Sequence, residues 1–273
     1  MTTLDNEIRP APGRRRDSRR VGAMLVRVLL PALTLVGLVA LWWLATIIFE
    51  WESFIVPTPQ DVWEEAKAQR EVLPAHFRTT LSETLQGFAI AIAIAVPCAV
   101  AIAYSRVLEL TIYPALVALN AIPKIAIAPL LVIWMGFGAG PKIAMVVLIC
   151  FFPIVISTAT GLKATPAELV ELGRSLSASP FQQFRKVRFP AALPYVFVGL
   201  KVAIALAVIG AVVGEFVGAT EGLGYLIIAS GQSANTALAF VAIVLLSLMS
   251  IVLFYAVVLV ERLLVPWSAE TST

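Results

Sequence analysis

Six apolar stretches, separated by short polar segments, constrain the fold of this chain more than any other feature. A helix that crosses the roughly 30 Å hydrocarbon core of a membrane needs about 20 apolar residues. The stretches are 24–49, 81–104, 110–137, 143–161, 194–213 and 237–260. Hydrophobic residues make up 60% of the chain and charged residues 14%, which is too little charge for a water-soluble domain. The sequence therefore predicts an all-α polytopic membrane protein with six transmembrane helices.

The charges between the stretches predict which side of the membrane each segment faces. Arginines crowd the tail 1–23, basic residues outnumber acidic ones in 162–189, and the segment 50–80 is acidic. Since Lys and Arg are retained on the cytoplasmic side, we expect 162–189 and both termini to lie in the cytoplasm. The chain then divides into a cytoplasmic tail 1–23, a membrane domain 24–265 and a cytoplasmic tail 266–273.

Few side chains in this sequence are suited to catalysis or metal binding. A single histidine, His76, excludes a histidine-rich metal site and a Ser-His-Asp triad, and we expect it to be solvated at the membrane surface. Cys98 and Cys150 fall inside apolar stretches and are expected to be buried packing residues. The arginines have no aromatic residues between them, which argues against a nucleic-acid partner. We therefore expect a chain that is not an enzyme and holds no metal or cofactor.

The second stretch is rich in small residues. These are Gly87, Ala89, Ala91, Ala93 and Ala95. Small side chains let the backbones of neighbouring membrane helices approach closely. We therefore expect this stretch to lie in the interior of a helix bundle.

The third stretch, 110–137, contains three prolines that interrupt it at membrane depth, with Asn120 and Lys124 between them. A broken helix in a membrane normally lines a cavity, because its freed backbone groups need polar partners. Asn120 and Lys124 are therefore candidates to line a path through the membrane. For Lys124, capping of the helix break is an equally open interpretation.

Two further ionisable residues lie near the ends of the fifth stretch. Lys201 is about 10 Å deep at the 1.5 Å rise of a helix, so we expect its side chain to extend to the membrane surface. Glu215 lies near the other end, beside the glycine-rich segment 222–224. We expect it to be solvated there, with contact to an outer gate as the alternative.

The segment 162–189 has the pattern of two short helices joined by a turn. Thr165 and Pro166, with Glu168, predict the capped start of a first helix. Capping and breaking residues in 177–180 predict the start of a second. The second helix mixes aromatic and basic residues, which suits a groove on a partner protein. An amphipathic loop on the membrane surface remains the alternative, and physics alone favours it.

This segment resembles the EAA loop of the permeases of binding-protein-dependent ABC importers, whose pattern is Glu-Ala-Ala, x3, Gly, x9, Ile-x-Leu-Pro. The matching residues are Glu171, Leu172, Gly173, Ser177, Val187, Phe189 and Pro190. Ser177 departs from the pattern, because the turn glycine of the family adopts positive φ at little cost and serine does not. The resemblance implies that these residues, with Phe181 and Phe184, contact a separate ATPase subunit.

Other segments are similar to the nitrate, sulfonate and taurine subgroup of that family. They are Pro57-x-Pro59, 122–126, Pro129-Leu130, 134–138 and 222–226. The resemblance implies a MetI-like permease fold of a type I importer in the bacterial inner membrane. In such a permease, the polar and ionisable residues near membrane depth, Asn120, Lys124 and Glu215, are the candidates for the translocation path. Its implied partners are membrane lipid, an extracytoplasmic solute-binding protein, a second copy of the chain, and an ATPase that holds ATP and Mg²⁺.

The implied solute is a small organic or inorganic anion such as a sulfonate, taurine or nitrate, with a pyrimidine or another small metabolite as the alternative. An ion-coupled secondary transporter is less consistent with the sequence, because the acidic residues lie near the ends of the stretches. The absence of a phosphate-binding G-x-x-x-x-G-K-[ST] motif agrees with ATP hydrolysis on a partner chain.

Overall fold

The computed structural model describes residues 15–267, with the side chains of all but 15–28, 31 and 32. Within that range every regular element is a helix. Residues 1–14 of the predicted first tail and 268–273 of the second lie outside the described residues. The chain divides into two units, 1–61 and 62–273, and each is described by itself.

The first unit contains α1 (Arg15–Ile48) and the start of α2 (Pro59–Ala68). Helix α1 begins within the predicted tail 1–23, because arginine favours helix and no proline interrupts the chain between Pro12 and Pro31. At the start of α2, the Thr58 N–H donates to Asp61 Oδ2 at 2.9 Å, and the Asp61 N–H donates to Thr58 Oγ1 at 3.2 Å. The Thr58 N–H also lowers the pKa of the Asp61 carboxyl.

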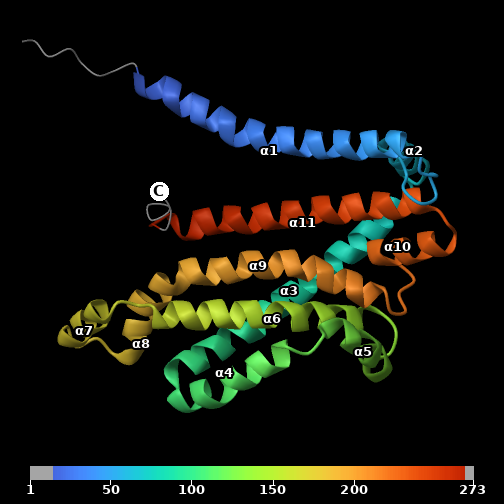
Figure 1. Ribbon diagram of the computed structural model, residues 1–273. Helices are drawn as coiled ribbons and strands as arrows, with labels where there is room; N and C mark the ends of the chain where they lie inside the picture. The colour runs from blue at the N-terminus through green and yellow to red at the C-terminus, as the bar shows by residue number, and fades with distance from the viewer. Residues whose placement is uncertain (1–14, 268–273) are drawn as a thin grey trace, which may run out of the picture. The chain divides into compact units, whose positions relative to one another are not determined.

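The second unit continues from α2 and holds the remaining helices (Figure 1). They are α3 (Leu73–Tyr104), α4 (Arg106–Asn120), η1 (Lys124–Ile127), α5 (Ala128–Met135), α6 (Ala139–Lys163), α7 (Ala167–Ser175), α8 (Pro180–Gln183), the π-helix η2 (Phe184–Arg188), α9 (Phe189–Glu215), α10 (Leu223–Gln232) and α11 (Thr236–Leu264).

Among the described residues, four helical segments are long and apolar enough to cross a membrane: α3, α6, α8 to α9, and α11. Helix α4 and the segment 124–135 form a fifth when taken together, with a bend of 85° between them at the predicted break. The predicted span 24–49 falls on α1, whose part Leu33–Ile48 is an apolar helix. The all-helical, multi-span fold class is confirmed, and the count of six spans stays a prediction.

Local signals fix several of the helix ends. Ser105 ends α3 and caps α4, where its hydroxyl accepts from the Leu108 N–H at 3.3 Å. Asn235 caps α11 by accepting from the Leu238 N–H at 3.1 Å. Between α5 and α6, Gly136 and Gly138 have φ of 78° and 126°, values that glycine adopts without strain.

The centre of the second unit is a three-helix layer in which α6 packs along both α9 and α3 (Figure 1). Small residues of α3 enter its core at every fourth position: Gly87, Ala91, Ala95 and Ala99 are buried. Ala89 and Ala93 are exposed in the isolated chain, so the predicted packing of this stretch inside the bundle is confirmed for one of its faces. A helix turns 100° per residue, and alternate residues therefore point to opposite sides.

Two glycines set the close approach of α9 to α6. A Cβ atom at Gly210 would lie 2.9 Å from Val146 Cα, and one at Gly214 would lie 2.8 Å from Lys142 Cα. These neighbours are backbone atoms, so they cannot move away without shifting the helix. Any side chain at either position would have to separate α6 from α9.

We expect Gly210→Ala to lower the free energy of unfolding by about 1–3 kcal/mol, the usual cost of overpacking. Gly231→Ala is the matched control, because no atom of the described chain lies within 4 Å of the corresponding Cβ position on α10. Thermal unfolding of the purified protein in detergent measures both effects. Equal stability of the two variants would show that the α6–α9 contact tolerates separation.

Candidate functional site

The segment after α6 folds into the two predicted short helices. Helix α7 begins at Ala167, but Pro166 occupies its N-cap position and Thr165 instead donates to the Leu162 carbonyl at 3.3 Å. The predicted Thr165 cap is therefore wrong, because the chain leaves α6 with that hydroxyl turned back to the helix it ends. The second helix, α8, starts as predicted: Ser179 and Gln182 form a capping box with bonds of 3.3 and 2.9 Å.

Ser177 forms the turn between α7 and α8 with a φ of 56°. This is the left-handed conformation that the glycine of the EAA pattern would adopt more cheaply. Two hydrogen bonds hold it: the Ser177 N–H donates to Arg174 O at 2.9 Å, and the Ala178 N–H donates to Gly173 O at 3.0 Å. The substitution therefore keeps the turn geometry at a cost in local strain.

Apolar side chains of α7 and α8 face solvent in the isolated chain. Leu172 is 57% exposed, Leu176 73% and Phe181 69%, and Leu169 is exposed beside them. Glu171 is also exposed, one residue before Leu172. Gly173 is half-buried, and a Cβ atom there would lie 3.4 Å from Gln183 Cγ. Exposed leucine and phenylalanine on a pair of short helices are typical of a surface that a partner or a membrane covers.

Phe184 does not join that exposed surface. The centre of its ring lies 5.8 Å from that of Tyr104 of α3 in an edge-on contact, and 5.6 Å from that of Phe189 in a tilted one. The Arg188 guanidinium lies 5.3 Å from the centre of the Tyr104 ring. Val187, Phe189 and Pro190 are half-buried around it. These residues fasten the loop to the bundle, and η2 continues directly into α9.

At the break between α4 and η1, Lys124 caps the helix that ends at Asn120. Its Nζ donates to the Asn120 backbone carbonyl at 3.3 Å and to Asn120 Oδ1 at 2.6 Å. Both residues line a hollow of about 330 Å³, whose other walls include Leu116 and Phe151. The capping interpretation of Lys124 is thus confirmed, while its contribution to a path through the membrane stays a prediction.

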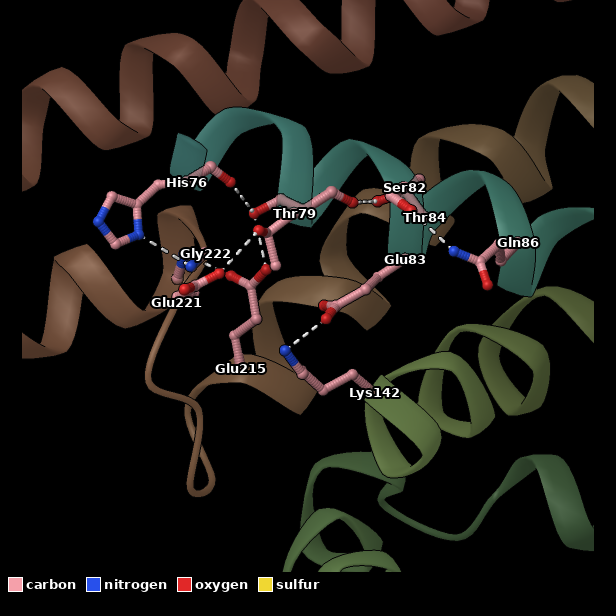
Figure 2. Close-up of polar contacts among 12 residues, drawn as sticks. His76, Thr79, Ser82, Glu83, Thr84, Gln86, Lys142, Glu215, Glu221 and Gly222 are labelled. Carbon is pink, nitrogen blue, oxygen red and sulfur yellow. Dashed lines mark hydrogen bonds and ion pairs between the residues drawn. The ribbon is translucent and has the colours of Figure 1, made fainter. Parts of the chain in front are cut away.

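Glu215 lies at the opposite end of the bundle and is only 1% exposed, so the expectation that it is solvated is wrong (Figure 2). The Thr80 hydroxyl donates to its Oε1 at 2.6 Å, and the Gly224 N–H donates to its Oε2 at 2.6 Å. The segment after α9 folds back over the carboxyl group, and a Cβ atom at Gly222 would collide with it.

His76 is buried beside Glu215, so its predicted solvation is also wrong (Figure 2). Its Nδ1 accepts from the Gly222 N–H at 3.0 Å, and its ring stacks on Tyr225 at 6.0 Å. Thr80 Oγ1 accepts from the Leu223 N–H at 2.8 Å. His76 therefore fixes the segment that follows α9 onto α3.

Glu83 and Lys142 form a buried ion pair between α3 and α6, which the sequence did not single out (Figure 2). One buried face of α3 carries Gly87 together with three polar residues, Thr80, Glu83 and Thr84. Their helical spacing was the sequence signal that could have indicated a buried polar site.

Two further ion pairs join helices nearer the end of the bundle where α7 begins. Lys201 pairs with Glu261 of α11 at 2.9 Å, so it does not extend alone to the surface as expected. Lys163 at the end of α6 pairs with Glu109 of α4 at 2.9 Å.

The family model "Binding-protein-dependent transport system inner membrane component" matches residues 87–267. The riboflavin transport system permease protein of Chloroflexus aurantiacus is 38% identical over 87% of this chain and 89% of its own. A putative aliphatic sulfonates transport permease protein of Bacillus subtilis is 29% identical over 95% of this chain and 92% of its own.

A solved chain of the MetNI methionine ABC transporter, in an inward-facing conformation, superimposes with a TM-score of 0.61. It covers 68% of this chain and 93% of its own length at 23% identity, which establishes the MetI-like fold. The predicted resemblance and fold class are confirmed, and the secondary-transporter alternative is not favoured. The chain belongs to the family of inner membrane components of binding-protein-dependent transport systems, and it is a permease of an ABC importer for a small solute.

Proposed function

We propose that this permease acts as a homodimer and that each copy binds an ATPase subunit through residues 162–189. The observation that supports this most directly is the exposed apolar row on α7 and α8, with Glu171 beside it. Such a row fits a hydrophobic groove on a partner, which contacts anchors at helical spacing. ATP and Mg²⁺ belong to the ATPase in this proposal, and this chain holds neither.

The orientation follows from the basic residues of the same segment. Arg174, Arg185, Lys186 and Arg188 accompany the apolar row, and positive charge is retained in the cytoplasm. In this arrangement both termini of the chain also lie in the cytoplasm. The opposite end of the bundle, with His76 and Glu215, faces the solute-binding protein outside.

The coupling mechanism rests on the continuity between the loop and α9. When ATP closes the ATPase pair, the two loops are drawn together, and η2 passes this displacement into α9 without an intervening flexible joint. Phe184 on Tyr104 and Lys163 on Glu109 carry α3 and α4 along. The bundle then moves as a rigid body, and the access to the path alternates between the two sides of the membrane.

A pull-down with a tagged permease tests the ATPase contact. We expect an ATPase with a phosphate-binding motif to purify with the wild type, and to be lost when residues 162–189 are replaced by a flexible linker of equal length. Mass spectrometry identifies the proteins in both samples. Replacement of the exposed segment 50–56 is the matched control, because it lies before α2 and outside the proposed contact. An ATPase that stays with the linker variant would contradict the proposal.

Glu171→Lys tests the same contact with a single charge. We expect solute uptake to fall at least about tenfold with unchanged protein in the membrane, since a reversed charge in a buried contact costs roughly 2–5 kcal/mol. Uptake of labelled solute into cells measures the loss. Glu64→Lys, on α2 and also exposed, is the control and should retain uptake, because it lies outside residues 162–189. Normal uptake in Glu171→Lys would place Glu171 outside the contact.

We propose further that the solute is a small organic or inorganic anion such as a sulfonate, taurine or nitrate, delivered by the binding protein to a path between two copies of the chain. Asn120 and Lys124 line that path, because their hollow offers one ammonium group in otherwise apolar walls. The sulfonate permease of Bacillus subtilis supports an anionic solute. Glu215 is left out of the path, since Thr80 and Gly224 enclose its carboxyl group.

Lys124→Met tests the role of this charge. We expect uptake of a transported anion to fall about tenfold, as for loss of roughly 1.4 kcal/mol of interaction, while Lys124→Arg retains most of it. The measurement uses cells that express the whole transporter and a panel of taurine, an alkanesulfonate, nitrate, riboflavin and a pyrimidine. Uptake of riboflavin or the pyrimidine, with none of any anion, would contradict the anionic solute and favour the alternative.

A further inference from the structure

The buried polar cluster at the end of the bundle away from α7 has an unequal number of charges (Figure 2). Glu83, Lys142 and Glu215 are 4%, 7% and 1% exposed. Two carboxyl groups thus face one ammonium group in a region with almost no water. An uncompensated negative charge in such a place is costly, so a protein normally neutralises it with a proton or a cation.

The hydrogen bonds of the two carboxyl groups show which oxygen atom has no positive or hydrogen-bonding partner for its negative charge. One oxygen of Glu83 pairs with Lys142, whereas its Oε2 has no hydrogen-bond partner among the residues that the structure describes. Both oxygens of Glu215 already accept, from Thr80 and from Gly224. Figure 2 shows the side chains of Glu83 and Glu215 projecting into the same space beside Lys142. Since an ionised carboxylate only accepts, these two groups can bond to one another only through a proton.

We propose that Glu83 and Glu215 share one proton, which makes the pair a buried proton-binding site that locks the segment 222–224 against α3. With the proton bound, the cluster carries one negative and one positive charge, and the unpartnered oxygen of Glu83 gains a donor. The proton comes from solvent and returns to solvent, so no other co-reactant is needed.

The glutamate pair belongs to a set of hydrogen bonds that holds the backbone at the start of α10 against α3 and α9. Glu215 receives the Gly224 N–H, Thr80 receives the Leu223 N–H, and His76 receives the Gly222 N–H. A Cβ atom at Gly224 would lie 2.7 Å from Glu215 Oε2, so the backbone lies directly on the carboxyl group. Loss of the proton places two like charges together and pushes Glu215 away from this backbone.

Every element around the pair contributes to its charge environment. His76 comes from α3, Lys142 from α6 and Glu221 from the segment before α10, where Glu221 Oε2 lies 3.4 Å from the Thr79 hydroxyl. Glu221 adds negative charge and Lys142 supplies the positive charge. Proton binding balances this excess of negative charge, and it does so whichever solute the permease carries. The proposed ATPase contact lies at the other end of α6 and α9, so the proton site does not depend on it.

Infrared spectroscopy of the purified permease tests the proton directly. We expect the C=O stretching band of a protonated carboxyl group in the wild type near neutral pH, and its loss on titration to alkaline pH. Glu215→Gln should remove the band, because the amide cannot hold the proton. Glu221→Gln is the matched control and should keep it, since Glu221 is exposed and outside the pair.

The pH dependence of unfolding gives a second measurement. The folded wild type holds a proton that the unfolded chain releases, so its unfolding temperature should fall by several degrees as the pH rises. Glu215→Gln should flatten this slope, because the side-chain amide of the new glutamine donates to Glu83 at every pH. The Thr80 hydroxyl then donates to the His76 carbonyl, 3.2 Å away, in place of Glu215. Glu221→Gln should retain the slope.

Three results would overturn the proton site. One is a wild type with no protonated-carboxyl band, which decides the matter even if Glu215→Gln fails to fold. Another is a band or a pH slope that persists unchanged in Glu215→Gln. The third is stabilisation by sodium at fixed pH that saturates and disappears in Glu215→Gln, because the compensating ion would then be a metal cation.

Discussion

The close contact between α6 and α9 is the interaction on which the other features of this permease depend. In lipid, apolar side chains gain little by leaving one apolar environment for another, so helices associate where small residues allow their backbones to touch. Gly210 and Gly214 provide such contacts on α9, and a Cβ atom at Gly161 of α6 would lie 3.0 Å from the Ala192 carbonyl oxygen of α9. This contact runs the length of the bundle. It places Lys142 at one end beside Glu83, and it places the start of α7 at the other end beside η2.

Local sequence signals predicted most of the fold, because the structures they specify depend on residues close together in the chain. The apolar stretches, the break near Asn120 and the capping box at Ser179 are of this kind. Where a local prediction failed, a nearby alternative competed with it, as when Thr165 bonded back to α6 rather than capping α7. The EAA pattern identified the loop, but the pattern did not show that Ser177 would adopt the left-handed turn or that Phe184 would face Tyr104.

The pairing within the buried polar cluster could not be predicted, since its partners are far apart in sequence, although the polar face of α3 is visible in the sequence. Thr80 and Glu215 are separated by 135 positions, and His76 and Gly222 by 146. Glu215 precedes a glycine-rich turn, which normally indicates solvent, but this turn folds back and covers the carboxyl group instead. His76 follows an amphipathic helix and has the sequence context of a surface residue. Only the three-dimensional arrangement of α3, α9 and α10 reveals that both side chains serve as buried acceptors for one backbone segment.

The two ends of the bundle are stabilised in opposite ways, and this difference determines how a force at one end can act at the other. The α7–α8 end exposes leucine and phenylalanine in the isolated chain. At the Glu215 end, by contrast, the carboxyl groups are bonded within the described chain, except for one oxygen of Glu83. A partner that binds the first end can therefore supply free energy, and the second end can resist movement until that free energy exceeds the hydrogen bonds that hold it. Because α9 joins the two ends without interruption, the proposed coupling would have to break the hydrogen bonds at Glu215 before the segment after α9 could move.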